Sequence, residues 1–81
     1  MPSYSSSRKK DPALVALGEA IQRIRIANRV SQERLALDAG VDRSYMGGVE
    51  RDDSNVTVLN LLKIACALNV SASDILVQAG L

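Results

Sequence analysis

The spacing of aliphatic residues constrains the fold of this chain more than any other feature of its sequence. From Pro12 onward, apolar side chains recur at steps of three and four residues, which is the period of an amphipathic α-helix. We predict the first helix over residues 12–28, with proline in the opening turn, where it is tolerated. Its inward-facing residues are Leu14, Leu17, Ile21 and Ile24. No segment alternates strictly enough to predict a strand.

Residues that favour helix N-caps divide the rest of the chain into four shorter helices. Ser31, Asp42 and Thr57 precede three of them, and the stretch 71–74 resembles a capping box before the last. Gly40 is expected to end the second helix in the left-handed conformation. The residues expected to face inward in the first three of these helices are Leu35, Ala36, Ala39, Met46, Val49, Val58, Leu61, Leu62, Ala65 and Leu68. The last helix would carry Ile75, Leu76 and Ala79. The sequence therefore predicts an all-α fold, a compact five-helix bundle.

The length of the chain indicates a single folded domain, and its composition indicates an N-terminal arm. The chain has 81 residues and a net charge of +1, from 10 basic and 9 acidic residues. Residues 1–11 are polar, Ser-rich and without periodicity, so we predict a flexible arm there and the folded domain over residues 12–81. The arm carries Arg8, Lys9 and Lys10, a cluster more typical of a solubilising tail than of a groove-reading arm.

Composition excludes several classes of site. The chain has no histidine, which excludes histidine-based acid–base catalysis and histidine-ligated zinc, and neither paired carboxylates nor a phosphate-binding loop indicates an enzyme. Cys66 is the only cysteine, and we expect it to be a small buried apolar residue. No apolar run is long enough for a membrane span, and no secretory signal is visible. We therefore expect a cytoplasmic protein without metal, cofactor or small-molecule ligand.

Residues 32–51 have the spacing of a helix–turn–helix. Two helices that cross steeply over a short turn need a small residue where they touch and a turn residue that accepts positive φ. Ala36 and Gly40 meet these two needs. Val41, Met46 and Val49 are predicted to hold the second helix of the motif against the bundle. Each feature alone is common in helical proteins, so the joint spacing carries the prediction.

Residues 17–76 resemble the DNA-binding domain of the phage Cro and CI repressor family of helix–turn–helix regulators, also called the XRE type. Within that family, the stretch DRSYMGGVER, followed by Asn55 and Thr57, is similar to the controller proteins of restriction–modification systems. The resemblance implies a lambda-repressor-like fold that binds double-stranded DNA. One departure is Asp52, where the family often has glycine. Asp52 and Asp53 add negative charge near the expected phosphate path.

The resemblance also implies roles for individual residues. Those expected to contact bases are Arg43, Ser44, Tyr45 and Gly48. Those expected to contact phosphates are Ser31, Gln32, Gly47, Arg51, Asn55 and Thr57. Arg25 and Glu50 are expected to form a structural ion pair between the first helix and the recognition helix. Packing is an equally good interpretation of Tyr45.

Two adjacent glycines, Gly47 and Gly48, interrupt the predicted recognition helix. Each costs a helix interior up to about 1 kcal/mol relative to alanine. We expect these glycines to face DNA and to let the helix backbone sit close to the groove. Arg43 and Ser44, at the start of the helix, would then carry the sequence specificity.

The predicted function is that of a controller-like, autoregulatory transcriptional regulator that acts as a homodimer on a palindromic operator. RNA polymerase is the further partner that such a regulator would block or recruit. The residues expected to form the dimer contact are Ile75, Leu76, Val77 and Leu81. An antitoxin, or another protein-interaction module that neutralises a partner protein, is the alternative, and an enzyme has less support.

Overall fold

Five α-helices make up the described part of the chain, as the helical periodicity predicts. They are α1 (Pro12–Ala27), α2 (Gln32–Ala39), α3 (Arg43–Glu50), α4 (Val58–Ala67) and α5 (Ala72–Gln78). The computed structural model describes residues 11–51 and 55–81, and it has no strand within those ranges. The predicted arm lies outside the described residues except for residue 11, and so do Asp52 and Asp53.

Side-chain caps begin three of these helices where the sequence predicts them. The Ser31 hydroxyl accepts a hydrogen bond from the backbone N–H of Arg34, and Thr57 caps α4 in the same way. At α5 the capping box over residues 71–74 is complete, with both reciprocal hydrogen bonds present. Asp42 precedes α3 in extended conformation but makes no side-chain cap hydrogen bond.

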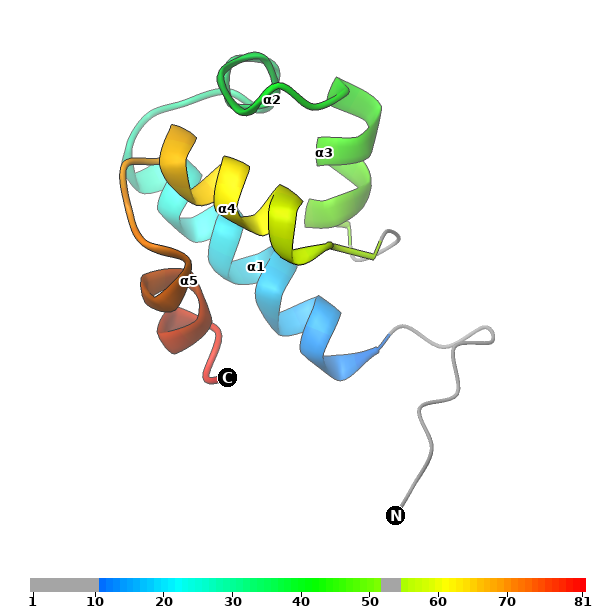
Figure 1. Cartoon of the computed structure of the whole chain (residues 1–81), viewed down its shortest axis with the longest axis vertical. Helices are drawn as coiled ribbons and strands as arrows, with labels where there is room; N and C mark the ends of the chain where they lie inside the picture. Colours follow the sequence, from blue (N-terminus) through cyan, green and yellow to red (C-terminus); the bar gives the residue numbers. More distant parts are fainter. Residues whose placement is uncertain (1–10, 52–54) are drawn as a thin grey trace.

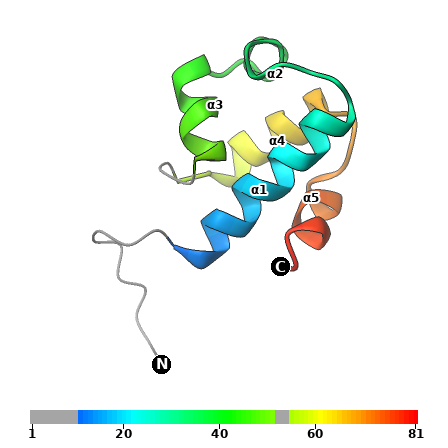
Figure 2. The same ribbon diagram turned by 180° about the vertical axis from the view of Figure 1, so that it is seen from behind.

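The helices enclose one aliphatic core. α2 contacts both α3 and α4, α3 also contacts α1, and α5 contacts α1 and α4. The two ribbon views show α2 lying across one end of the bundle and α5 near the opposite end, close to the C-terminus (Figures 1 and 2). The largest fully buried side chains come from all five helices: Ile21, Leu35, Met46, Val49, Ile64 and Ile75. This core leaves the α2–α3 corner at the surface.

The buried face of α4 differs from the predicted one. Val58 and Leu62 were expected to face inward, but they are 74% and 50% exposed. Ile64, which the predicted stripe omits, is fully buried. Leu62 lies about 100° around the helix from the buried Leu61, and Val58 lies in a first turn that the core does not cover.

Cys66 is exposed, so the expectation that it is buried is wrong. It follows Leu62 by four residues and therefore shares the exposed side of α4. Among the described residues, no single helix is long and apolar enough to cross a membrane. Only α4 and α5 taken together reach the required length and composition, as a pair bent by 95°.

Candidate functional site

The corner between α2 and α3 has the backbone geometry of a helix–turn–helix. Gly40 ends α2 with φ of +71°, in the left-handed region, and the Val41 N–H donates to the Ala36 carbonyl at 3.0 Å. This closes the left-handed C-terminal motif that glycine favours. A Cβ on Gly40 would meet nothing within 4 Å, so the backbone conformation, rather than lack of space, requires glycine there. The predicted structural roles of Ala36 and Gly40 are confirmed.

Apolar anchors fix α3 to the core on one side. Met46 and Val49 are 0% and 1% exposed, and Val41 is half-buried against the same core. The motif spacing predicted that these three residues hold α3 against the bundle. The first turn of α3 carries Arg43 and Ser44, and both are exposed. The bundle therefore presents the start of α3 to its surroundings.

Tyr45 braces α3 against the beginning of α4. Its hydroxyl donates to the backbone carbonyl of Asn55 at 3.0 Å and accepts from the Asn60 amide at 3.1 Å. The ring is half-buried against the core. Tyr45 thus packs within the protein and its hydroxyl is hydrogen-bonded there, while its expected base contact stays a prediction.

A buried ion pair fixes the other end of α3. The Arg25 Nε and Nη2 atoms donate to Glu50 Oε2 and Oε1 at 2.7 and 3.0 Å, which makes the contact bidentate. Arg25 Nη1 also donates to the Val30 carbonyl at 2.7 Å. The Glu50 side chain is 1% exposed and that of Arg25 is 12% exposed. The predicted ion pair is confirmed, and it joins α1, the following loop and α3.

Gln32 joins this network, a role that sequence reasoning missed. Its Nε2 donates to Glu50 Oε1 at 3.0 Å, so the first residue of α2 is tied to the last residue of α3. A side-chain amide has two N–H donors, and this bond uses one of them. Nothing in the spacing of these residues distinguishes a Gln32 bound to Glu50 from one that faces solvent.

The glycine pair does not lie on the exposed surface of α3. Gly47 and Gly48 are both buried, so the expectation that Gly48 faces outward to read bases is wrong. A Cβ on Gly47 would lie 3.1 Å from Arg51 Nη1 and 3.8 Å from Gln32 Oε1. Gly47 therefore lies where the end of α3 meets the start of α2.

The other residues expected at phosphates lie at helix ends. Ser31 and Thr57 are exposed N-cap residues of α2 and α4. Asn55 is exposed, and its carbonyl accepts the Tyr45 hydroxyl. Arg51 is exposed and follows α3 directly. These described residues therefore provide helix N-termini and amide, hydroxyl and guanidinium groups, which can form hydrogen bonds to a ligand. No cluster of metal-binding side chains accompanies them there.

The predicted dimer contact is wrong in one member. Ile75 is fully buried in the core of the single chain and has no surface to offer a partner. Leu76 is partly buried against the same core. Val77 and Leu81 are 77% and 61% exposed. The exposed apolar surface of α5 and the C-terminus therefore centres on the last two residues.

Comparisons with known proteins match most of the chain. A family model described as helix-turn-helix matches residues 21–75. Control protein C.SmaI of Serratia marcescens is 43% identical over 65 residues, which cover 80% of this chain and 77% of the relative. Control protein C.BamHI of Bacillus amyloliquefaciens is 37% identical over 60 residues, which cover 73% of this chain and 74% of the relative. The predicted similarity to controller proteins is confirmed.

Solved structures of controller proteins share the fold. The restriction-modification controller protein C.AhdI from Aeromonas hydrophila is 45% identical, with a TM-score of 0.75, over 76% of this chain and 94% of that chain. The controller protein C.Esp1396I is 31% identical, with a TM-score of 0.75, over 83% of this chain and 92% of that chain. That structure is a tetramer in complex with its natural 35-base-pair operator.

Proposed function

Since the chain belongs to the helix-turn-helix family of DNA-binding regulators, we propose that it recognises a specific palindromic operator as a homodimer. This family consists of transcriptional regulators rather than enzymes. The observation that carries the proposal is the presentation of α3. Met46 and Val49 anchor one side of the helix, while Arg43 and Ser44 remain exposed on its first turn.

Base recognition falls to the first turn of α3, which enters the major groove. An arginine there donates two hydrogen bonds to O6 and N7 of a guanine, worth roughly 1–3 kcal/mol of discrimination against other bases. Arg43 supplies this group, and the neighbouring Ser44 hydroxyl both donates and accepts hydrogen bonds. Neither side chain packs into the core, so both can reach base edges without disturbing the fold.

Phosphate contacts fall on both sides of α3. At the start of α2, the second N–H of the Gln32 amide and the helix N-terminus capped by Ser31 favour an anion. Beyond α3, Arg51 supplies a positive charge, and Asn55 and Thr57 supply polar groups before α4. These contacts set the register of the protein on the duplex, while the first turn of α3 reads sequence.

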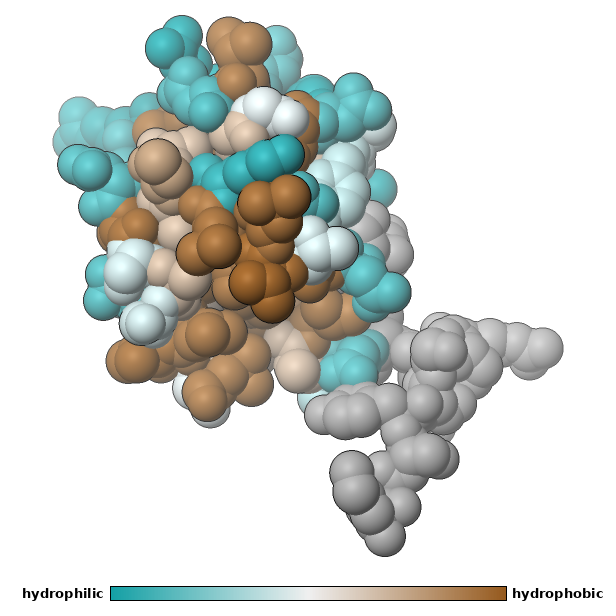
Figure 3. Space-filling view, in the orientation of Figure 1, coloured by the Kyte–Doolittle hydropathy of each residue, from teal (hydrophilic) through white to brown (hydrophobic). Residues whose placement is uncertain are grey.

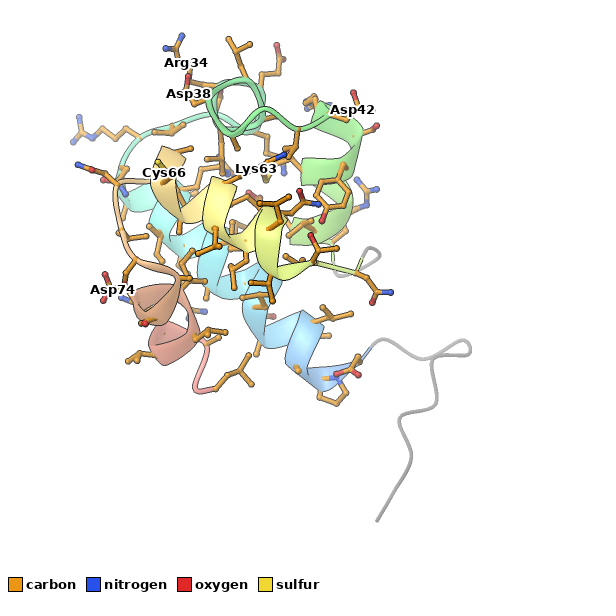
Figure 4. The ribbon with its side chains drawn as sticks, viewed as in Figure 1. Arg34, Asp38, Asp42, Lys63, Cys66 and Asp74 are labelled. Carbon is orange, nitrogen blue, oxygen red and sulfur yellow. The ribbon has the colours of Figure 1, made fainter. Side chains whose placement is uncertain are left out.

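Salt titration of duplex binding tests the DNA-binding proposal. We expect the logarithm of affinity to fall linearly with the logarithm of salt concentration, with a slope near −0.9 for each phosphate contacted. Arg43→Ala is expected to weaken binding to an operator duplex, obtained by selection from random sequences, by about tenfold or more. The matched control is Arg34→Ala, because Arg34 pairs with Asp38 on the outer surface of α2 (Figure 4) and should leave operator affinity unchanged. Absence of salt-dependent duplex binding would remove the proposed function.

The homodimer is supported by the exposed apolar surface. Figure 3 shows apolar residues on the side of the molecule where α4 and α5 lie. The large apolar side chains exposed on these helices and at the C-terminus are Val58, Leu59, Leu62, Val77 and Leu81. A small domain gains stability by covering such residues with a second copy. Two-fold pairing would present two α3 helices about 34 Å apart, one turn of DNA.

Control of transcription follows from occupancy of the operator. The similarity to control proteins supports a controller-like regulator that acts near its own gene. Bound at a promoter, the dimer blocks RNA polymerase or recruits it, according to where the operator lies. Protein concentration sets occupancy, since dimerisation and binding both follow mass action.

A further inference from the structure

Gly47 lies between two polar side chains at the junction of α2 and α3. Arg51 follows it by four residues, and the guanidinium Nη1 folds back to within 3.1 Å of the point that a Gly47 Cβ would occupy. Gln32 Oε1, from the start of α2, lies 3.8 Å from the same point. The bare backbone of Gly47 is therefore the surface over which the Arg51 guanidinium lies, next to Gln32.

Helix geometry explains why the missing side chain matters. Residues four apart lie on the same face of a helix, one above the other. A Cβ on residue 47 would lie 3.1 Å from Arg51 Nη1, closer than a Cβ normally approaches another atom, so the guanidinium would have to shift by a few tenths of an ångström. Gln32 Oε1 would be in ordinary van der Waals contact at 3.8 Å, and its amide is held by the buried Glu50, so Gln32 would stay in place. Arg51 would have to move.

We propose that Gly47 is a positioning residue for DNA binding, which seats the Arg51 guanidinium beside Gln32 so that both side chains meet the same stretch of phosphate backbone. The inference rests on the DNA-binding function proposed above. This positioning role, rather than a close approach of the helix backbone to the DNA groove, would explain why position 47 is glycine. Gly47 itself touches no phosphate and acts through Arg51.

The substitution Gly47→Ala should separate this role from folding. Alanine has a higher helix propensity than glycine, and the atom that its Cβ would meet is the end of a flexible side chain. The melting temperature of the variant is therefore expected to equal or exceed that of the unchanged protein. Its operator affinity is nevertheless expected to fall, because the shifted guanidinium meets its phosphate with poorer geometry.

A double-mutant cycle on the full chain tests the mechanism. Gly47→Ala, Arg51→Ala and the double variant are titrated with the selected operator duplex at several salt concentrations. Arg51→Ala is expected to weaken binding by about tenfold and to reduce the salt slope by about one, and Gly47→Ala is expected to weaken binding by a smaller factor in the same direction. The double variant is expected to bind no more weakly than Arg51→Ala alone, because both changes act on one contact. Arg34→Ala controls for the loss of a positive charge on an exposed surface.

Three results would overturn the inference. If Gly47→Ala left the operator affinity and the salt slope unchanged, glycine at position 47 would not be needed to position the Arg51 guanidinium. Losses that multiply in the double variant would show that Gly47 acts independently of Arg51. If Arg51→Ala bound the operator as tightly as the unchanged protein does, the guanidinium would have no role in DNA binding. Failure of the unchanged protein to bind any duplex would remove the proposed function as well, so the two failures are distinguishable.

Discussion

Glu50→Ala is expected to destabilise the fold by about 3–5 kcal/mol, the usual cost of removing one partner of a buried ion pair. The substitution leaves the Arg25 guanidinium, only 12% exposed, without its bidentate carboxylate, and Gln32 loses its acceptor. The start of α2 and the end of α3 are then no longer tied together. The free energy of unfolding, measured by urea denaturation at a fixed protein concentration, gives the size of the effect.

The matched control for that experiment is the exposed ion pair of the same chain. Asp38 accepts from Arg34 Nε at 3.1 Å, one turn away on α2, and the two side chains are 38% and 65% exposed. Asp38→Ala is expected to cost about 0.3–0.5 kcal/mol, because solvent screens such a pair. Glu50→Gln retains the shape of the side chain and is expected to fall between the two. Equal costs for Glu50→Ala and Asp38→Ala would contradict the role given to the buried network.

Ile64→Ala is expected to destabilise the fold by about 2–5 kcal/mol. Ile64 is fully buried in α4, the helix that contacts both α2 and α5, and truncation leaves a cavity between them. Because the side chain lies in the core and not on α3, the variant is expected to bind operator DNA normally under conditions in which it remains folded. Urea denaturation and duplex titration of the same preparation measure the two properties.

Ile64→Val provides the matched comparison at the same position. Removal of one methylene group is expected to cost about 0.5–1.5 kcal/mol, well below the cost of alanine. A steep increase from valine to alanine indicates close packing around Ile64. If alanine cost no more than valine, the core around Ile64 would be loose, contrary to its full burial.

Local chemistry made the helix ends and the α2–α3 corner predictable. Ser31, Thr57 and the capping box at 71–74 satisfy orphan backbone donors with their own side chains, so their sequence positions mark where helices begin. Gly40 adopts positive φ, which few other residues tolerate. The corner of the motif therefore depends on residues whose preferences act within one turn of the chain.

Tertiary contacts were harder to predict. Arg29 and Asn69 follow the C-caps of α1 and α4 with φ of 59° and 62° although neither is glycine, and periodicity alone does not reveal such sites. The exposure of Val58, Leu62 and Cys66 depends on how far the other helices cover α4. An apolar residue at helical spacing is compatible with either the rim or the centre of a buried face.

The buried network at the end of α3 was predictable only in part. The pair of Arg25 and Glu50 follows from the family resemblance, and the distances confirm it. The hydrogen bond from Gln32 to Glu50 joins residues 18 positions apart. The Arg51 guanidinium lies over the backbone of Gly47, four residues before it, and both contacts form only in the folded chain. Propensity argues against glycine in a helix, and the structure explains the glycine by what lies over it.

Selection of bound sequences from random duplexes tests the central claim most directly. The unchanged protein is expected to select an inverted repeat whose half-sites lie about one helical turn apart, with a guanine preference in each half-site. The double variant Arg43→Lys and Ser44→Ala retains the charge, and it is expected to select the same spacing with a weaker guanine preference, because lysine lacks the planar two-donor fork of arginine. An identical motif for both proteins, at equal strength, would contradict the account that the first turn of α3 reads DNA sequence.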